Sequence, residues 1–118
     1  MDYDKLADAW YAAWNSHDLD AIMALYAGDV RFTSPYVRTL GFAVDGTLTS
    51  KSDLRRYFEL GLSKIPDLYF TPVVNCVSLG SHTMVYRNQS DAWVTEMHEY
   101  DGDGLIVRVI ASYAGSPA

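Results

Sequence analysis

The stretch of sequence that decides the fold is residues 12–29, AAWNSHDLDAIMALYAGD. It closes one helix, breaks at residues 15–17 and opens a second helix that Asp18 can cap. The apolar residues of the second helix recur at helical spacing and are expected to face inward: Ile22, Leu25 and Tyr26. Two helices joined by a tight break therefore open the structure.

Reading outward from this stretch, Asp2 can cap the first helix, whose apolar stripe includes Trp10 and Trp14. Downstream, residues 30–34 alternate like a strand, which Pro35 ends. Residues 35–49 show no clear period, so we expect a long loop. A loop of this length in a compact domain is typical of a functional lid or a disordered segment. The segment, with Tyr36, Gly41 and Phe42, is a candidate lid, and the sequence leaves its role open.

The second half of the chain changes from helical to strand periodicity. Residues 50–53 form a capping box that predicts a third helix, with Leu54, Tyr57, Phe58 and Leu62 on one side. Beyond the turn at Pro66 and Asp67 the period becomes two, in four runs at 68–79, 82–88, 93–100 and 105–113. Short turns separate these runs and predict an antiparallel meander. The predicted order is α-α-β-α-β-β-β-β, an α+β class, in one domain over residues 1–118.

Composition narrows the function classes. The chain has 118 residues, of which 49% are apolar and 14% aromatic, enough for one core without a disulfide or metal. The net charge of −6 disfavours nucleic acid and an anionic membrane surface as partners. The acidic start of the chain does not resemble a signal peptide, so we expect a cytoplasmic protein. Cys76 is alone, and no residue spacing suggests a metal site or a cofactor.

Residues 12–29 resemble the opening of the nuclear-transport-factor-2-like superfamily, which includes SnoaL-like cyclases and ketosteroid isomerases. Residues 32–35 are similar to the end of its first strand, and residues 101–106 to its last hairpin. The resemblance implies a conical half-barrel, in which three N-terminal helices pack in the concave face of a curved, mixed but mostly antiparallel sheet. It also implies a pocket open at one end and a homodimer through the outer face of the sheet.

The resemblance can be followed residue by residue. Where ketosteroid isomerases have an oxyanion-hole tyrosine, a general base and an oxyanion-hole acid, this chain has Trp10, Ser34 and Glu96. The helix Tyr-Asp pair of scytalone dehydratase falls on Trp14 and Asn15, and the last-strand aspartate of the cyclases falls near Ser112. We therefore expect a family member without an intact known catalytic set, because only the Glu96 position keeps its chemistry.

One strand carries the candidate catalytic residues. In the run 93–100, Val94, Glu96, His98 and Tyr100 share a face by the two-residue period. A buried carboxyl beside a histidine can exchange protons near neutral pH, so Glu96 and His98 are the predicted catalytic pair. The positions expected to contact substrate are Trp10, Trp14, Tyr26, Ser34, Tyr57, Arg87, Val109, Ala111 and Tyr113.

Structural roles for the same residues stay open at this point. Glu96 could form a structural ion pair with Arg87 on the preceding strand, and His98 could be a hydrogen-bonded core residue. Arg87 could instead anchor an anionic group of a ligand. Trp10, Trp14, Tyr57 and Tyr113 could be core rather than pocket, and His82, which follows a turn, is predicted at the surface.

The leading hypothesis is a cofactor-independent acid–base enzyme of isomerase, cyclase, dehydratase or hydrolase type, acting on a small hydrophobic substrate. A binding module with the same pocket is the first alternative, because Ser34 stands at the usual base position. A dimerisation or interaction domain is the second alternative. The sequence does not identify the substrate or the reaction, and it leaves the oligomeric state open.

Overall fold

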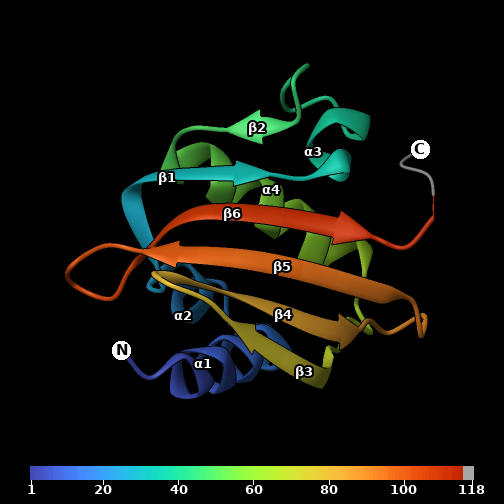
Figure 1. Ribbon diagram of the computed structural model, residues 1–118. Coiled ribbons are helices and arrows are strands. Elements are labelled where there is room, and N and C mark those ends of the chain that lie inside the picture. The colour runs from blue at the N-terminus through green and yellow to red at the C-terminus, as the bar shows by residue number, and fades with distance from the viewer. Residues whose placement is uncertain (116–118) are drawn as a thin grey trace.

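The computed structural model describes residues 1–115, in which six strands form one mixed sheet with helices on its concave side (Figure 1). The helices are α1 (Tyr3–Ser16), α2 (Leu19–Met23), α3 (Pro35–Thr39) and α4 (Lys51–Lys64). The strands are β1 (Tyr26–Thr33), β2 (Thr47–Leu48), β3 (Thr71–Val77), β4 (Ser81–Arg87), β5 (Trp93–Tyr100) and β6 (Ile106–Tyr113). Their order in the sheet is β2-β1-β6-β5-β4-β3.

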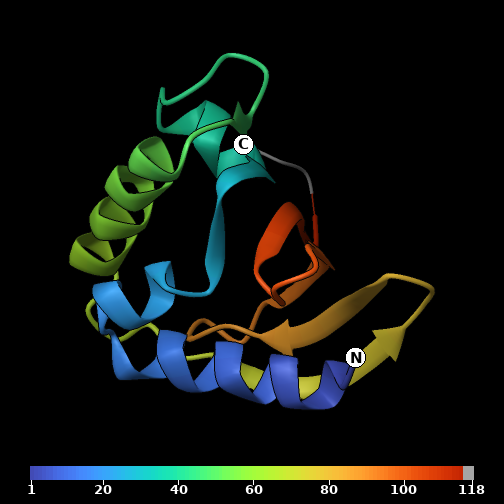
Figure 2. The same cartoon turned by 90° about the vertical axis from the view of Figure 1, so that its left-hand side faces the viewer.

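The sheet is curved around its helices (Figure 2). Helix α1 runs along β3 and β4, and α4 stands beside β1. Strands β3 to β6 form the predicted antiparallel meander, and β1 joins it through a parallel pairing with β6. The α+β class and the half-barrel with N-terminal helices in its concave face are thereby confirmed.

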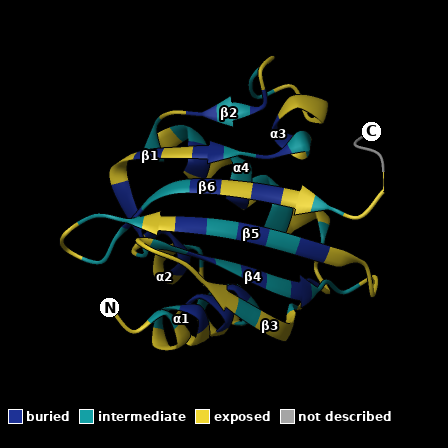
Figure 3. Cartoon of the chain, in the orientation of Figure 1, coloured by how far each residue is buried: buried dark blue, intermediate teal, exposed yellow. Residues whose placement is uncertain are grey.

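Burial alternates along the central strands (Figure 3). On β5, Val94, Glu96 and His98 are buried and point to the concave side. The intervening residues point to the outer face and are partly exposed, as the two-residue period requires. The predicted catalytic side chains, Glu96 and His98, therefore face the helices.

The second helix is shorter than predicted. It ends at Met23, and Tyr26 begins β1 instead of lying on the helix. The cause is the parallel partner strand: the amide of Ile106 donates to the carbonyl oxygen of Leu25 at 2.9 Å, and Tyr26 pairs with Ile106. This pairing with a distant strand places Tyr26 in the sheet, although its spacing would also have allowed the helix to continue.

The prediction of one long loop over residues 35–49 was wrong, because the segment contains α3 and β2. Pro35 occupies the first turn of α3, and the hydroxyl of Ser34 accepts the amide hydrogen of Tyr36 at 3.2 Å. Gly46 has a φ of +78°, and a Cβ there would lie 3.3 Å from the carbonyl oxygen of Ser34. Elements of five and two residues are too short to give a sequence period, which is why both were missed.

Candidate functional site

A cavity of about 470 Å³ opens between α4, α3 and the concave face of the sheet. Small-molecule sites commonly measure 300–1,000 Å³, so it can hold a compact organic ligand. Its wall is mainly aromatic and aliphatic, formed by Trp14, Phe32, Tyr36, Leu40, Tyr57, Phe58, Ile65, Leu68, Phe70, Tyr86, Val94 and Tyr113. Polar lining residues come from the end of α4 and from the β4–β5 turn: Lys64, Asn88, Gln89 and Ser90.

Among the described residues that line the cavity, Glu96 is the only one with a carboxyl group. Its side chain is almost fully buried, and the hydroxyl of Tyr86 donates to Oε2 at 2.6 Å. Burial, and then the neighbouring Glu96 carboxyl, raise the pKa of Tyr86 well above its usual value. The phenol therefore keeps its hydrogen and serves Glu96 as a permanent neutral donor.

His98 supplies the second partner of Glu96. Its Nε2 lies 3.1 Å from Oε1 of Glu96, whereas its buried Nδ1 has no hydrogen-bond partner within residues 1–115. Placing the hydrogen on Nε2 gives an N–H to carboxylate bond, but placing it on Nδ1 would bury an unpaired donor. The pattern places a hydrogen on Nε2 of His98, so Glu96 accepts from both Tyr86 and His98.

Two further phenols of the lining, Tyr57 and Tyr113, are kept protonated. Burial raises the pKa of Tyr57 to about 12, an effect that the hydroxyl of Ser34 opposes and that Glu96 reinforces. Burial also raises the pKa of Tyr113, with Tyr57 and Glu96 adding in the same direction. The Tyr57 hydroxyl donates to the hydroxyl oxygen of Ser34 at 3.5 Å, a long bond that a ligand oxygen could replace.

Three predicted substrate contacts are core residues in the structure. The indole N–H of Trp10 donates to the hydroxyl of Tyr26 at 3.0 Å, and neither side chain lines the cavity. Ser34 is 1% exposed, and its hydroxyl accepts the amide hydrogen of Tyr36 at the start of α3. Ser34, which stands where related isomerases have their base, therefore caps a helix in this chain.

The remaining predicted contacts divide between the two faces of the sheet. Val109 and Ala111 are buried on β6 but do not line the cavity. Arg87 points to the outer face, where it pairs with Asp91 at 3.0 Å and lies over the ring of Trp93. The alternative in which Arg87 forms an ion pair with Glu96 does not hold. The cross-strand partner of Glu96 is Met84, and Arg87 and Glu96 lie on opposite faces of the sheet.

Of the predicted site residues, the cavity brings together Glu96, Trp14, Tyr57 and Tyr113, with His98 directly behind Glu96. Sequence reasoning missed Tyr86. It precedes Arg87 on β4, the strand that pairs with the strand of Glu96, and its side chain faces the opposite side of the sheet from that of Arg87. A correct strand register would have placed it on the inner face.

The prediction that His82 lies at the surface was also wrong. It is 1% exposed on β4, directly opposite His98 on β5. Because the turn ends at Ser81, the next residue already belongs to the strand and faces inward.

No three histidine, cysteine or carboxylate side chains within residues 1–115 are grouped so that they could hold a metal ion. No helix in that range has the length and apolar character needed to cross a membrane.

Comparison with known proteins points to one family. The family model of the SnoaL-like domain matches residues 7–114. A SnoaL-like protein of unknown function from Burkholderia thailandensis is 30% identical with a TM-score of 0.89, over 95% of this chain and 94% of that one. No curated protein sequence gives a significant match.

Two more distant structures share the fold. A candidate ketosteroid isomerase from Kribbella flavida is 21% identical, with a TM-score of 0.74 over 95% of this chain and 77% of that one. A candidate polyketide cyclase from Sinorhizobium meliloti is 14% identical, with a TM-score of 0.74 over 92% of this chain and 94% of that one. The same cone-shaped fold is thus found in proteins assigned to different chemistries.

Proposed function

The chain belongs to the SnoaL-like family, and we propose that it is a cofactor-independent acid–base enzyme acting on a small hydrophobic substrate. The observation that carries this proposal is the position of Glu96, a buried carboxyl that lines an aromatic cavity and accepts from Tyr86 and His98. Proteins bury a carboxyl beside a ligand cavity at a cost, and such groups are enriched at functional sites.

In this proposal Glu96 is the general base. Both hydrogen bonds that it receives stabilise the carboxylate, and its remaining lone pairs can accept a proton from a substrate C–H or O–H group. Glu96 then returns that proton to another atom of the substrate. Isomerisation, cyclisation, dehydration and hydration all contain such a transfer, so the reaction class is defined by proton movement.

The rest of the cavity suits a substrate with an apolar body and a polar oxygen. Rings on α1, α4 and β6, among them Trp14, Tyr57 and Tyr113, supply flat apolar contact surface. The protonated phenols of Tyr57 and Tyr113 can donate to an oxygen that gains negative charge during the transfer. Lys64 and Gln89 at the polar end of the cavity can contact a hydrophilic substituent.

A thermal-shift screen with steroids, terpenoids, polyketides and epoxides is the first experiment. Ligands that fill the cavity raise the melting temperature, because they bind the folded state only. Each stabilising compound is then incubated with the wild-type protein, and its conversion is followed by mass spectrometry and NMR. We expect at least one compound to be converted, and stabilisation without any conversion would contradict an enzyme.

A binding module is the second candidate, and one observation favours it. Ser34 stands at the position of the base in related isomerases, but its hydroxyl caps α3. Among the described residues that line the cavity, only Glu96 then has a carboxyl group. A module of this kind would bind a stabilising compound with an affinity that Glu96→Gln leaves unchanged. It would not convert the compound.

We also propose that two copies pair through the outer face of the sheet. Apolar side chains on this face are uncovered in one chain: Val74 is 51% exposed and Ile110 is 39% exposed. Burying such a face stabilises association by about 25 cal/mol per Å² of apolar surface. Sedimentation velocity should give a dimer that Ile110→Lys converts to a monomer, while Val44→Lys, at an exposed residue away from the strands, leaves it intact.

A further inference from the structure

His82 lies buried behind the pair formed by Glu96 and His98. It faces His98 directly across the β4–β5 pairing, and its side chain is 1% exposed. Burial lowers the pKa of His82 to about 4; the nearby His98 acts in the same direction, and Asp4 opposes it. The ring of His82 is therefore neutral at physiological pH and carries its hydrogen on one nitrogen.

Its neighbours fix which nitrogen that is. The amide nitrogen of Asn75 donates to the carboxylate of Asp4 at 3.0 Å and to the carbonyl oxygen of Tyr3 at 3.4 Å, which fixes the orientation of the Asn75 amide. The Asn75 oxygen then accepts from Nδ1 of His82 at 2.8 Å, so Nδ1 carries the hydrogen. Nε2 of His82 is left as an acceptor for the hydroxyl of Tyr100 at 2.5 Å.

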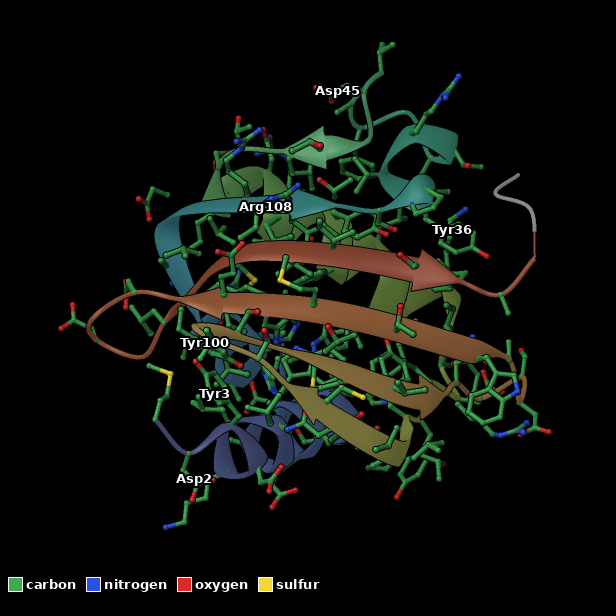
Figure 4. The ribbon with its side chains drawn as sticks, viewed as in Figure 1. Asp2, Tyr3, Tyr36, Asp45, Tyr100 and Arg108 are labelled. Atoms are coloured by element: carbon green, nitrogen blue, oxygen red, sulfur yellow. The ribbon has the colours of Figure 1, made fainter. Side chains whose placement is uncertain are left out.

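This anchoring reaches from the start of α1 to the end of β5. Tyr3 and Tyr100 lie beside each other in Figure 4, and their ring centroids are 6.0 Å apart. The His82 ring packs against both of them in tilted contacts, with centroid distances of 5.2 Å to Tyr3 and 5.4 Å to Tyr100. Its position is thus set by two hydrogen bonds and two ring contacts.

The ring of His98 depends on such support. Its hydrogen bond to Glu96 is its only one within residues 1–115, because Nδ1 is unpartnered. Edge contacts hold it on several sides, with centroid distances of 5.6 Å to His82 and 5.5 Å to Trp10. One hydrogen bond does not fix a planar ring, so these contacts decide which ring edge faces Glu96.

We propose that His82 is a positioning residue for the chemistry at Glu96: its ring, locked in one tautomer by Asn75 and Tyr100, holds His98 so that Nε2–H points at Glu96. This inference rests on the proposed function, since it assumes that Glu96 is the base. It adds a residue that touches neither the cavity nor Glu96. It also makes the contact between α1 and the sheet part of the catalytic arrangement.

The test combines imidazole NMR with kinetics. In protein labelled with ¹⁵N-histidine, we expect His98 to carry its hydrogen on Nε2 and His82 on Nδ1, two different tautomers in one molecule. The variant His82→Gln can keep both polar contacts but loses the ring against His98. It should shift the His98 signals to an average of tautomers and lower kcat about tenfold, with KM within about twofold.

Two further variants make the outcome decisive. Tyr100→Phe removes the hydroxyl that occupies Nε2 of His82, while Asn75 still holds the hydrogen on Nδ1. It frees the ring on one side, so it should change the His98 signals and lower kcat even if His82→Gln does not fold. His17→Asn is the matched control, because His17 bonds the carbonyl oxygen of Leu68 and has a φ of 61°, which Asn tolerates. It should leave kcat and the His98 signals unchanged.

An Nε2–H tautomer of His82 in the wild-type protein would overturn the proposal. So would an unchanged His98 spectrum or an unchanged kcat in His82→Gln. The proposed function fails separately, because it requires that Glu96→Gln lose turnover, whereas the NMR measurement needs no substrate.

Discussion

The hydroxyl of Tyr86 lies 2.6 Å from Oε2 of Glu96, and both side chains line the cavity. A buried carboxyl group therefore receives a neutral donor at the wall of the cavity. Such a donor can stabilise a carboxylate without a cation beside it, which suits the role of base that we propose for Glu96.

Removing that donor should weaken catalysis but not binding. In Tyr86→Phe, Glu96 keeps only His98, and the lost hydrogen bond to a charged group is worth about 2 kcal/mol. We expect kcat to fall by up to about 30-fold because the Glu96 side chain loses a bond that holds it in place, with KM little changed. An unchanged kcat would mean that Tyr86 does not position Glu96.

The two buried tryptophans should separate core from pocket. Trp10→Phe removes the indole that donates to Tyr26 and leaves a void, so urea unfolding should report a loss of about 2–3 kcal/mol. Ligand affinity should hardly change, because Trp10 does not line the cavity.

Trp14→Phe is the counterpart. Trp14 lines the cavity, and its N–H has no partner within the described residues, so stability should change less. Isothermal titration with a ligand from the thermal-shift screen should show about a tenfold loss of affinity. Equal effects of the two variants on both quantities would contradict the division between core and pocket.

Alkaline pH should destabilise the protein through its phenols. Burial raises the pKa of six tyrosines: Tyr11, Tyr26, Tyr57, Tyr86, Tyr100 and Tyr113. The pKa of Tyr57 reaches about 12. In the unfolded chain these phenols release protons near pH 10, so stability from this source is complete below pH 10 and falls as pH rises towards 12. Absorbance at 295 nm should show them protonated at pH 10.5 in folded protein and ionised in urea. Equal absorbance in both states would refute this.

Acid pH should act through His82. Its pKa is about 4 in the folded protein and 6.5 in the unfolded chain, so the unfolded state binds the extra proton as pH falls from 6.5 to 4. The stabilisation is therefore present above pH 6.5 and lost through that window. Melting temperatures should fall more steeply in the wild-type protein than in His82→Gln, and parallel curves would exclude this contribution.

How far the sequence could predict the site depended on whether local periodicity or nonlocal pairing set each position. The period of two placed Glu96 and His98 on one face, and helical spacing placed Trp14 and Tyr57 toward the interior. Period alone does not fix strand register, which is why an ion pair between Arg87 and Glu96 stayed open and Tyr86 was missed. Tyr26, predicted on a helix, lies on β1 because its backbone pairs with Ile106 of β6, about eighty residues later in the sequence.

The aromatic content similarly divides between two roles. Trp10 and Tyr26 bond each other in the core, whereas Trp14, Tyr57 and Tyr113 form part of the cavity wall. All five rings lie on inward positions, and sequence spacing does not distinguish an inward position beside a cavity from one filled by neighbours.

The measurement that tests the central claim most directly is the turnover rate of Glu96→Gln on a compound that the wild-type protein converts. Gln keeps the size of the side chain but cannot take up a proton; its oxygen can accept from His98, and its amide nitrogen can donate to the hydroxyl oxygen of Tyr86. Loss of a general base should lower kcat at least 100-fold, with binding of the compound retained within about threefold. A Glu96→Gln protein with a kcat within about threefold of the wild-type value would contradict the assignment of Glu96 as the base.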